Sequence, residues 1–190
     1  TNRFQDPKKQ GGFYFTADDH ETLIQRPKPI FDDALPAGNG SAAQVLIKLG
    51  HLTNSIPYLV AAERAVKNAW PSIDRNPVGC STMLLALEEY YYPSQVVVIR
   101  GAGNDMELWQ QHCAKYYSPR RLVLAIPREA SALPEFLALR EAQDTMVAYI
   151  CDGVKCSAPV TDLAQLEQML QSRQAVPDAP KQSVSGKLLH

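Results

Sequence analysis

The sequence predicts an α+β fold in two parts, a set of antiparallel helical hairpins over residues 1–93 followed by a small α/β unit over residues 94–173. Up to about Tyr92, apolar residues recur every three or four positions, which is the period of one face of an α-helix. From Val96 to Ile99 the sequence changes to a continuous β-branched run, which is typical of a buried strand. Beyond Arg173, proline, serine, glutamine and lysine predominate, so residues 174–190 are expected to form a disordered tail.

The chain opens with a segment that contains few helix signals. Residues 11–16, Gly-Gly-Phe-Tyr-Phe-Thr, combine glycines with aromatic side chains, which indicates an extended segment or a hairpin arm. Between Asp18 and Gly40, the prolines at positions 27, 29 and 36 prevent a long helix. This long loop is of interest because such loops are uncommon inside compact domains and are often functional.

Three amphipathic helices are expected in the first part. The first begins near residue 42, with Asn39 or Ser41 available as its N-cap. The second runs from about Ser55 to Trp70 and is expected to end at Pro71. The third begins at Asn76, a capping residue followed by proline. Its expected buried positions are Cys80, Met83, Leu84, Leu87 and Tyr91. The short links between these helices make them antiparallel neighbours.

The second part begins with a βαβ pattern. A strand at Val96–Ile99 is followed by a helix from about Asp105 to Tyr117 and a second strand at Leu122–Ile126. A right-handed crossover between parallel strands is the expected topology. Gly101 and Gly103 supply only two glycines of a dinucleotide fingerprint, so a plain turn capped by Asn104 or Asp105 is preferred and no cofactor is predicted.

Three further elements complete the second part. A short helix is expected over residues 132–141 and a third strand over Thr145–Cys151. A hairpin at Asp152-Gly153 would return this strand towards Pro159. The last helix opens at Asp162, whose carboxylate can cap it in a capping box with Gln165.

The charge balance excludes several classes of partner. The chain has 20 acidic and 19 basic residues with no long block of either sign, so neither nucleic acid nor a membrane surface is an expected partner. No apolar run approaches the ~20 residues that cross a bilayer. Two of the four cysteines fall inside helical patterns where buried thiols are ordinary, so a reducing compartment, the cytoplasm, is expected. The opening residues contain no initiating Met and no signal pattern, which indicates a fragment.

The loop before the first helix contains the main candidate chemistry. Asp32 and Asp33 lead into a helix N-terminus, where a carboxylate could act as an acid, a base or an acceptor for a ligand hydroxyl. Capping of the helix by solvated aspartates is the alternative. Arg26 and Lys28 could clamp an anionic group or be surface charges. His20 lies in an acidic cluster, but no second histidine follows at a ligand spacing, so no metal site is predicted.

Cys151 and Cys156 flank a predicted hairpin, and the register decides whether their thiols can meet. With a two-residue turn at Asp152-Gly153 the sulfurs are offset, whereas a four-residue turn places them opposite each other. A thiol pair and two free, packed thiols both remain open, and the free thiols are preferred because of the expected reducing compartment.

Several segments together resemble one known family in order and spacing. They are Gly11–Thr16, Asp19–Glu21, Arg26–Lys28, Asp32–Pro36, Gly38–Asn39, Val96–Gly101, Ala148–Cys151, Cys156 and Pro159–Asp162. This pattern resembles the YyaL-type family, which includes the spermatogenesis-associated thioredoxin-domain proteins. Where that family usually has Ser-Gly-Asn-Ser, this chain has Ala-Gly-Asn-Gly at positions 37–40, and Asp33 replaces a smaller residue or Asn.

The resemblance implies a larger architecture and a function. Such proteins carry a thioredoxin-like domain and then an α/α toroid similar to those of N-acylglucosamine 2-epimerases and six-hairpin glycosidases. The first part of this chain would be a partial α/α toroid, whose exposed apolar stripes would pack against the missing N-terminal half of the toroid. The thioredoxin-like domain of the same protein would be a second partner. The toroid would bind or modify a small carbohydrate. Its site would contain Asp32 and Asp33 as catalytic residues and Asn39, Arg26, Lys28 and His20 as substrate-binding residues.

A non-catalytic role is the alternative to a carbohydrate-active enzyme. In that role the chain is a scaffold for the thioredoxin-like domain, and Cys151 and Cys156 form an accessory thiol pair or simply pack in the core.

Overall fold

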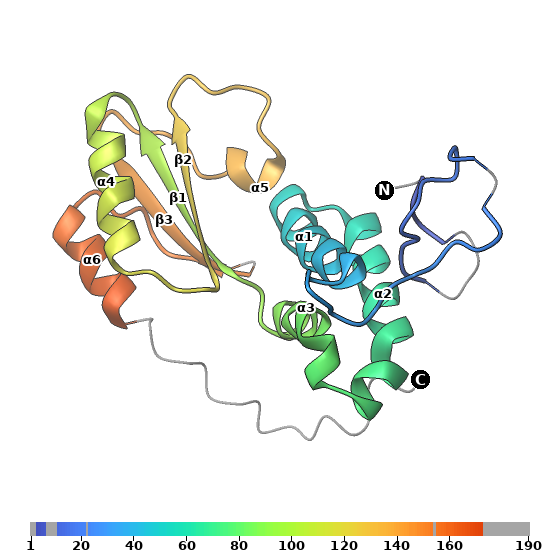
Figure 1. Ribbon diagram of the computed structural model, residues 1–190. Coiled ribbons are helices and arrows are strands. Elements are labelled where there is room, and N and C mark those ends of the chain that lie inside the picture. The colour runs from blue at the N-terminus through green and yellow to red at the C-terminus, as the bar shows by residue number, and fades with distance from the viewer. Residues whose placement is uncertain (1–2, 7–10, 22, 154, 173–190) are drawn as a thin grey trace. The chain divides into compact units, whose positions relative to one another are not determined.

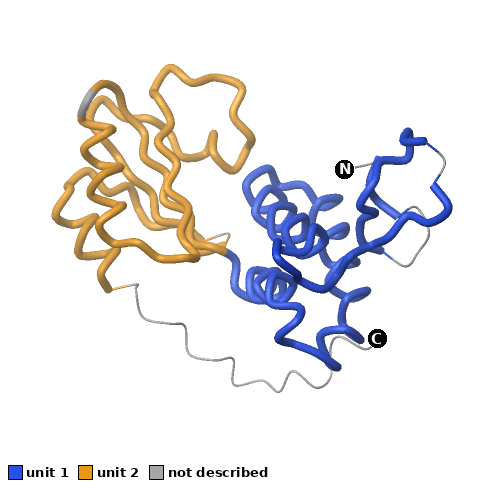
Figure 2. Tube along the Cα trace, viewed as in Figure 1, with its two compact units in different colours: residues 1–93 blue, residues 94–190 orange. Residues whose placement is uncertain are grey.

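The computed structural model describes residues 3–6, 11–21, 23–153 and 155–172, with the side chain of Asn104 left out. The tail predicted at residues 174–190 lies outside this described part. The chain forms two compact units, residues 1–93 and 94–190, which are coloured separately in Figure 2. The first unit is helical and the second contains a sheet with helices, which confirms the predicted α+β class.

The described residues of the first unit form three α-helices. Helix α1 (Gly38–Thr53) and helix α2 (Ile56–Arg75) make a helical hairpin, and a 3₁₀ turn, η1 (Val78–Cys80), leads into helix α3 (Ser81–Tyr91). Helix α1 packs against both of its neighbours (Figure 1), and a glycine lies at each contact. A Cβ at Gly40 would lie 2.8 Å from the backbone of Met83, and a Cβ at Gly50 would lie 2.6 Å from Leu59. The core side chains are Phe13, Ala43, Leu46, Ile47, Ala61, Ala62, Ala65, Val66, Ala69, Ile73, Cys80, Met83 and Ala86.

Two helix boundaries differ from those predicted. Pro71 lies inside α2, and the helix continues to Arg75 because Ile73 extends its apolar stripe and is only 4% exposed in the core. Helix α1 begins one turn before residue 42, with Ala37 at its N-cap position, so neither Asn39 nor Ser41 caps it. The backbone N–H of Gly79 donates to Asn76 Oδ1 at 3.1 Å, as expected for a capping residue.

The buried face of α3 was also predicted only in part. Cys80 and Met83 are fully buried, whereas Tyr91 is 44% exposed. The prediction for Tyr91 was therefore wrong. The helix instead buries Ala86 and Glu89, which continue the spacing of three residues from Met83.

The second unit is built on a four-stranded mixed sheet of order β2-β1-β3-β4. Strand β1 (Gln95–Gly101) is parallel to β2 (Arg121–Pro127), as predicted, and antiparallel to β3 (Val147–Asp152). Helices α4 (Asn104–Lys115) and α6 (Leu163–Ser172) cover one face of the sheet (Figure 1). The core on this face contains Val97, Ile99, Trp109, Cys113, Ala148, Ile150, Val160, Leu166 and Leu170.

The remaining elements of the second unit are short. Helix α5 covers Glu135–Ala138, inside the range predicted for it, and β4 covers Lys155–Cys156. The N-cap of α4 is Gly103, so neither Asn104 nor Asp105 caps that helix. Asp162 Oδ1 accepts the backbone N–H of Gln165 at 2.7 Å, which confirms the predicted cap of α6. Within the described residues, no helix is both long enough and apolar enough to cross a membrane.

Candidate functional site

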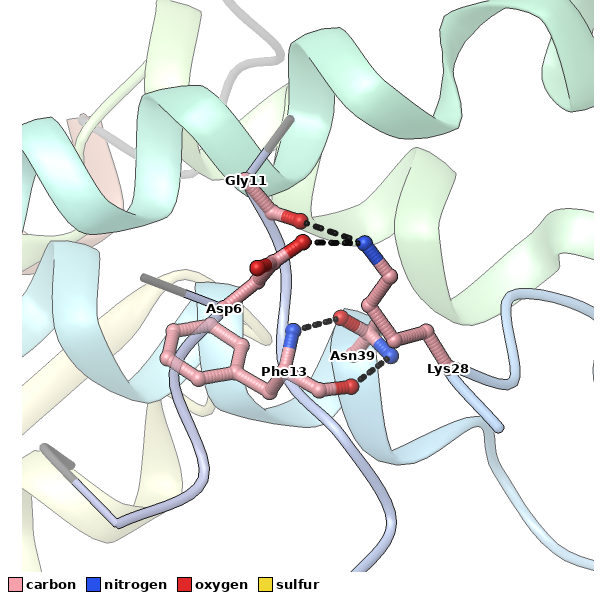
Figure 3. Close-up of polar contacts among 5 residues, drawn as sticks. All are labelled: Asp6, Gly11, Phe13, Lys28 and Asn39. Carbon is pink, nitrogen blue, oxygen red and sulfur yellow. Dashed lines mark hydrogen bonds and ion pairs between the residues drawn. The ribbon is translucent and has the colours of Figure 1, made fainter. Parts of the chain in front are cut away.

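Asn39 connects the first turn of α1 to the N-terminal segment, which comprises the described residues 3–6 and 11–16. Its Oδ1 accepts the backbone N–H of Phe13 at 2.7 Å, and its Nδ2 donates to the Phe13 carbonyl oxygen at 2.9 Å (Figure 3). The same Nδ2 also donates to the carbonyl oxygen of Pro29 at 2.9 Å. The residue is only 3% exposed. Because the amide makes these three hydrogen bonds inside the protein, its role in this structure is to hold the segment against the helix.

A second polar contact lies beside the first. Lys28 Nζ is 2.7 Å from the Asp6 carboxylate and donates to the Gly11 carbonyl oxygen at 3.2 Å (Figure 3). The Asp6 side chain is 1% exposed, so this ion pair is largely removed from water. A buried pair of this kind is strongly disrupted when one partner is removed, because the other charge is left without compensation.

Arg26 also holds the N-terminal segment. Its Nη2 donates to the carbonyl oxygen of Thr16 at 2.6 Å, and its guanidinium lies 4.3 Å from the centroid of the Tyr14 ring. The ammonium of Lys28 lies 5.4 Å from the same centroid. Both cations therefore make cation–π contacts with Tyr14, and the predicted anion clamp is occupied with internal contacts.

Asp32 joins the loop to the N-termini of two helices. Its Oδ1 accepts the backbone N–H of Ala37 at 2.8 Å, and its Oδ2 accepts that of Thr82 at 2.7 Å. Burial raises the pKa of Asp32, but the backbone donors at Ala37 and Thr82 outweigh it and hold the pKa below its ordinary value. The carboxylate is thus ionised and serves as a hydrogen-bond acceptor. Asp33 and His20 are exposed at the surface.

The structure shows an apolar cavity of about 550 Å³ between the N-terminal segment and the outer face of α1. It is lined by Phe4, Phe13, Tyr14, Phe15, Pro29, Gly38, Asn39, Ala42, Val45, Leu46, Leu49 and Tyr58. Of the six residues predicted to act on a substrate, Asn39 lines it, and the other five do not. The sequence signal that was missed is the aromatic run at residues 13–15, which was interpreted only as an extended arm.

Large apolar side chains around this cavity remain exposed. The exposed fractions are 72% for Phe15, 54% for Val45, 43% for Phe4 and 40% for Leu49. Val45 and Leu49 are one helical turn apart, so they form one stripe on α1. An apolar stripe next to a cavity is the arrangement that marks an interaction surface.

Comparison with known proteins gives a limited match. No family model matches the chain. The sequence is similar to spermatogenesis-associated protein 20. It is 26% identical to the human protein over 170 residues and 25% identical to the mouse protein over 174 residues. These alignments cover 85% and 88% of this chain but only 22% of each relative, so the chain spans about a fifth of their length. The predicted resemblance therefore extends over most of the chain.

The second unit contains the two cysteines whose pairing the sequence left open. Cys151 lies opposite Cys156 in the β3–β4 pairing, and the two are joined by a disulfide. The preference for free thiols was wrong. Asp152 pairs with Lys155, so the turn begins after Asp152, and this register places Cys151 directly opposite Cys156. The other two cysteines, Cys80 and Cys113, are free and buried. Within the described residues no group of three or more potential ligands could hold a metal ion.

The glycines after β1 have a structural explanation. A Cβ at Gly101 would lie 2.0 Å from Met146 Sδ, so the absence of a side chain permits packing against that residue. Gly103 has a φ of +70°, a conformation that glycine adopts readily. Both positions are therefore accounted for without a bound nucleotide.

Proposed function

We propose that the helical unit is a docking module of a longer protein, in which the cavity and the exposed stripe on α1 receive an amphipathic helix and so complete an α/α toroid. The single observation that carries the proposal is the apolar lining of the cavity together with the exposure of Val45 and Leu49. Apolar surface of this kind favours association by roughly 25 cal/mol per Å² removed from water.

The polar residues of the unit support this choice. Four polar side chains direct their polar groups to backbone or carboxylate atoms of the same unit, namely Asn39, Lys28, Arg26 and Asp32. They fix the shape of the cavity, and its wall presents mainly carbon atoms to an incoming group. An apolar helix face fits such a wall better than a strongly polar ligand does.

The identity of the docking helix is argued from the relatives. Each matched spermatogenesis-associated protein is several times longer than the chain, which aligns with 22% of it. The proposed occupant is a helical hairpin from the remaining part of such a protein, expected on resemblance to be the other half of the toroid. The thioredoxin-like domain is the second partner proposed on the same ground.

The test uses substitutions that change one side chain in the stripe. The chain would be mixed with the separately expressed remainder of the full-length protein, and binding measured by calorimetry. Leu49→Glu should weaken binding by at least tenfold, because it would bury a carboxylate in an apolar contact. Leu108→Glu is the matched control, since Leu108 is 45% exposed on α4, against 40% for Leu49 on α1. Equal binding by both variants would contradict the proposal.

A carbohydrate is the second candidate occupant of the same cavity. The observation that favours it is the set of aromatic residues in the lining, because aromatic faces can stack on the apolar faces of sugar rings. These residues are Phe4, Phe13, Tyr14, Phe15 and Tyr58. In this version the aromatic rings and Asn39 would contact the sugar. Asp32 and Asp33 would act on it only in the complete toroid, since neither lines the cavity of this chain.

Sugar binding and helix docking give different results in one experiment. A panel of mono- and disaccharides would be titrated while chemical shifts of the aromatic residues are followed by NMR. Shift changes that Tyr58→Ala abolishes would support the carbohydrate. No change at millimolar sugar, with binding of the helical remainder intact, would leave docking as the function of the cavity.

A further inference from the structure

The Cys151–Cys156 disulfide lies across neighbouring antiparallel strands and depends on no distant element. The Cα atoms of the two cysteines are 3.9 Å apart. One residue farther along, the backbone N–H of Ser157 donates to the carbonyl of Ile150 at 2.8 Å. The cysteines therefore occupy a pair without mutual backbone hydrogen bonds, the position at which opposite side chains approach most closely. Strand pairing would keep the two sulfurs adjacent after the bond between them is broken.

The two cysteine residues differ in their exposure to solvent. Cys151 is 0% exposed, because it lies in β3 within the sheet. Cys156 is in the short edge strand β4 and is partly exposed. A thiolate that attacks a disulfide must approach one sulfur directly. Cys156 is the more exposed residue of the pair, which favours attack at its sulfur with Cys151 as the leaving group.

A cation lies beside the sulfur of Cys156. Arg140 Nη2 is hydrogen-bonded to Cys156 Sγ. The same guanidinium is held in place by the Phe136 carbonyl oxygen, at 2.7 Å from Nη1, and by the Phe136 ring, whose centroid is 4.1 Å away. Arg140 is 8% exposed and forms no salt bridge with a carboxylate among the described residues. Its charge is therefore available to stabilise a thiolate on Cys156.

We propose that Cys151 and Cys156 form a redox-active pair that exchanges with external dithiols through Cys156, and that Arg140 is the positioning residue for the Cys156 thiolate. A thiolate of the dithiol attacks Cys156 Sγ, a mixed disulfide forms, and the bond to Cys151 breaks. Cys151 takes the electron pair and then a proton. The second thiol of the dithiol, as a thiolate, displaces Cys156, so that the dithiol is oxidised and the pair is reduced by two electrons. This proposal concerns the second unit alone and is independent of the docking function.

The first test identifies the reacting sulfur. The full chain would be equilibrated in redox buffers of reduced and oxidised dithiothreitol, and thiols would be alkylated and located by mass spectrometry. In the reduced, folded chain Cys156 should be labelled first, while the buried thiols of Cys151, Cys80 and Cys113 should be labelled much more slowly. Burial raises the pKa of Cys113 to about 11, which keeps that thiol protonated near pH 7. Resistance of the disulfide to excess dithiothreitol in the folded chain would overturn the proposal.

Single-cysteine variants then separate the two sulfurs. Cys151→Ser leaves Cys156 free and should form a mixed disulfide with oxidised glutathione. Cys156→Ser leaves the buried Cys151 and should react at least tenfold more slowly. Equal rates would overturn the assignment of Cys156 as the attacked sulfur. Circular dichroism would first establish that both variants are folded.

The role of Arg140 is tested in the Cys151→Ser background. The rate of Cys156 alkylation by iodoacetamide would be measured against pH. Arg140→Met should move the profile to higher pH and slow the reaction at pH 7 about tenfold, which corresponds to one pKa unit. Arg140→Lys should restore part of the rate, and Arg128→Met is the control with an exposed arginine. An unchanged profile in folded Arg140→Met would remove Arg140 from the proposal. If that variant does not fold, Arg140→Gln, which also removes the charge, is measured in its place and judged by the same criterion.

Discussion

The side-chain amide of Asn39 pairs with both backbone polar atoms of Phe13, with hydrogen bonds of 2.7 Å from the peptide N–H and 2.9 Å to the carbonyl oxygen. The two residues are 26 positions apart in the chain. This contact brings Phe13 onto the helical core and forms one wall of the cavity. The shape of the proposed docking site therefore depends in part on this buried amide.

Replacement of Asn39 by alanine should destabilise the first unit. The N–H and carbonyl of Phe13 would lose their partner in a buried place, and each such loss costs about 1–3 kcal/mol. Urea denaturation should show a decrease in unfolding free energy of about 3 kcal/mol. Ser41→Ala is the control, since within the described part of the chain the Ser41 hydroxyl makes one long contact, 3.3 Å, to the Ala37 carbonyl oxygen. A loss for Asn39→Ala no larger than that for Ser41→Ala would contradict the structural role of the amide.

Asp32 should contribute a pH-dependent part of the stability. Its pKa is lower in the folded protein than its ordinary value, because the N–H donors of Ala37 and Thr82 outweigh the effect of burial. A depressed folded pKa gives stability that is present above the unfolded pKa, about 3.9, and is lost as the pH falls through the folded value. Asp32→Asn should therefore lose less stability than the wild type when the pH is lowered from 6 to 3.

Thermal melting at a series of pH values measures this difference. Asp33→Asn provides the control, because Asp33 is the neighbouring carboxylate and is exposed. The prediction is that Asp33→Asn follows the wild-type pH dependence while Asp32→Asn departs from it below about pH 4. Parallel curves for wild type and Asp32→Asn would show that the two backbone donors do not favour the ionised carboxylate.

Gly11 should not accept a side chain. Its φ is +76°, and a Cβ there would lie 2.6 Å from the backbone carbonyl oxygen of Arg64 in α2. The left-handed conformation alone costs about 1–2 kcal/mol for a residue with a Cβ. The contact with the backbone adds to this, so Gly11→Ala should lower the unfolding free energy by about 3 kcal/mol or more.

Gly153→Ala measures the cost of the left-handed backbone conformation without a steric contact. Gly153 has a φ of +61°, and a Cβ at this position would meet no other atom within 4 Å. Its substitution should cost only about 1 kcal/mol. The difference between the two glycine variants in denaturant unfolding measures the steric contact with α2. Equal losses would show that the N-terminal segment moves away from the helix without cost.

The periodic features of the sequence were sufficient to predict most elements. The three-to-four-residue apolar period in α1 and the β-branched run at Val96–Ile99 correspond to a helix and a strand because burial of one face requires those periods. Pro71 was misjudged, since a local rule does not include the core contacts of Ile73 that continue the helix. Tertiary packing overrides local preference at such a position.

The site was less predictable than the elements because it depends on distant pairs. Asn39 was recognised as a polar residue at a helix start, but nothing local indicates that its partner is Phe13. For Cys151 and Cys156, a shift of the turn by one residue decides whether the sulfurs meet. The local sequence is compatible with two registers of the hairpin. The position of the turn is decided by how the strands pair in the folded sheet.

Arg100 offers a prediction of increased stability. This residue in β1 is 5% exposed, and its Nε and Nη1 atoms are buried without a hydrogen-bond partner among the described residues. Its remaining donor, Nη2, makes only a long contact of 3.5 Å to the Arg128 carbonyl oxygen. Its neighbours in the sheet register are Ile126 and Val147, which are apolar. A buried charge with so few partners is destabilising relative to an apolar side chain of similar length.

Arg100→Met should therefore raise the unfolding free energy of the second unit by about 1 kcal/mol or more, as measured by urea denaturation. Methionine fills a similar length of the site and requires no hydrogen bonds. Arg128→Met is the control, because the Arg128 side chain is 43% exposed and its replacement should change stability by less than about 0.5 kcal/mol. A decrease in stability for Arg100→Met, with Arg128→Met neutral, would mean that the Arg100 guanidinium has a stabilising partner in solution, such as a bound anion or ordered water.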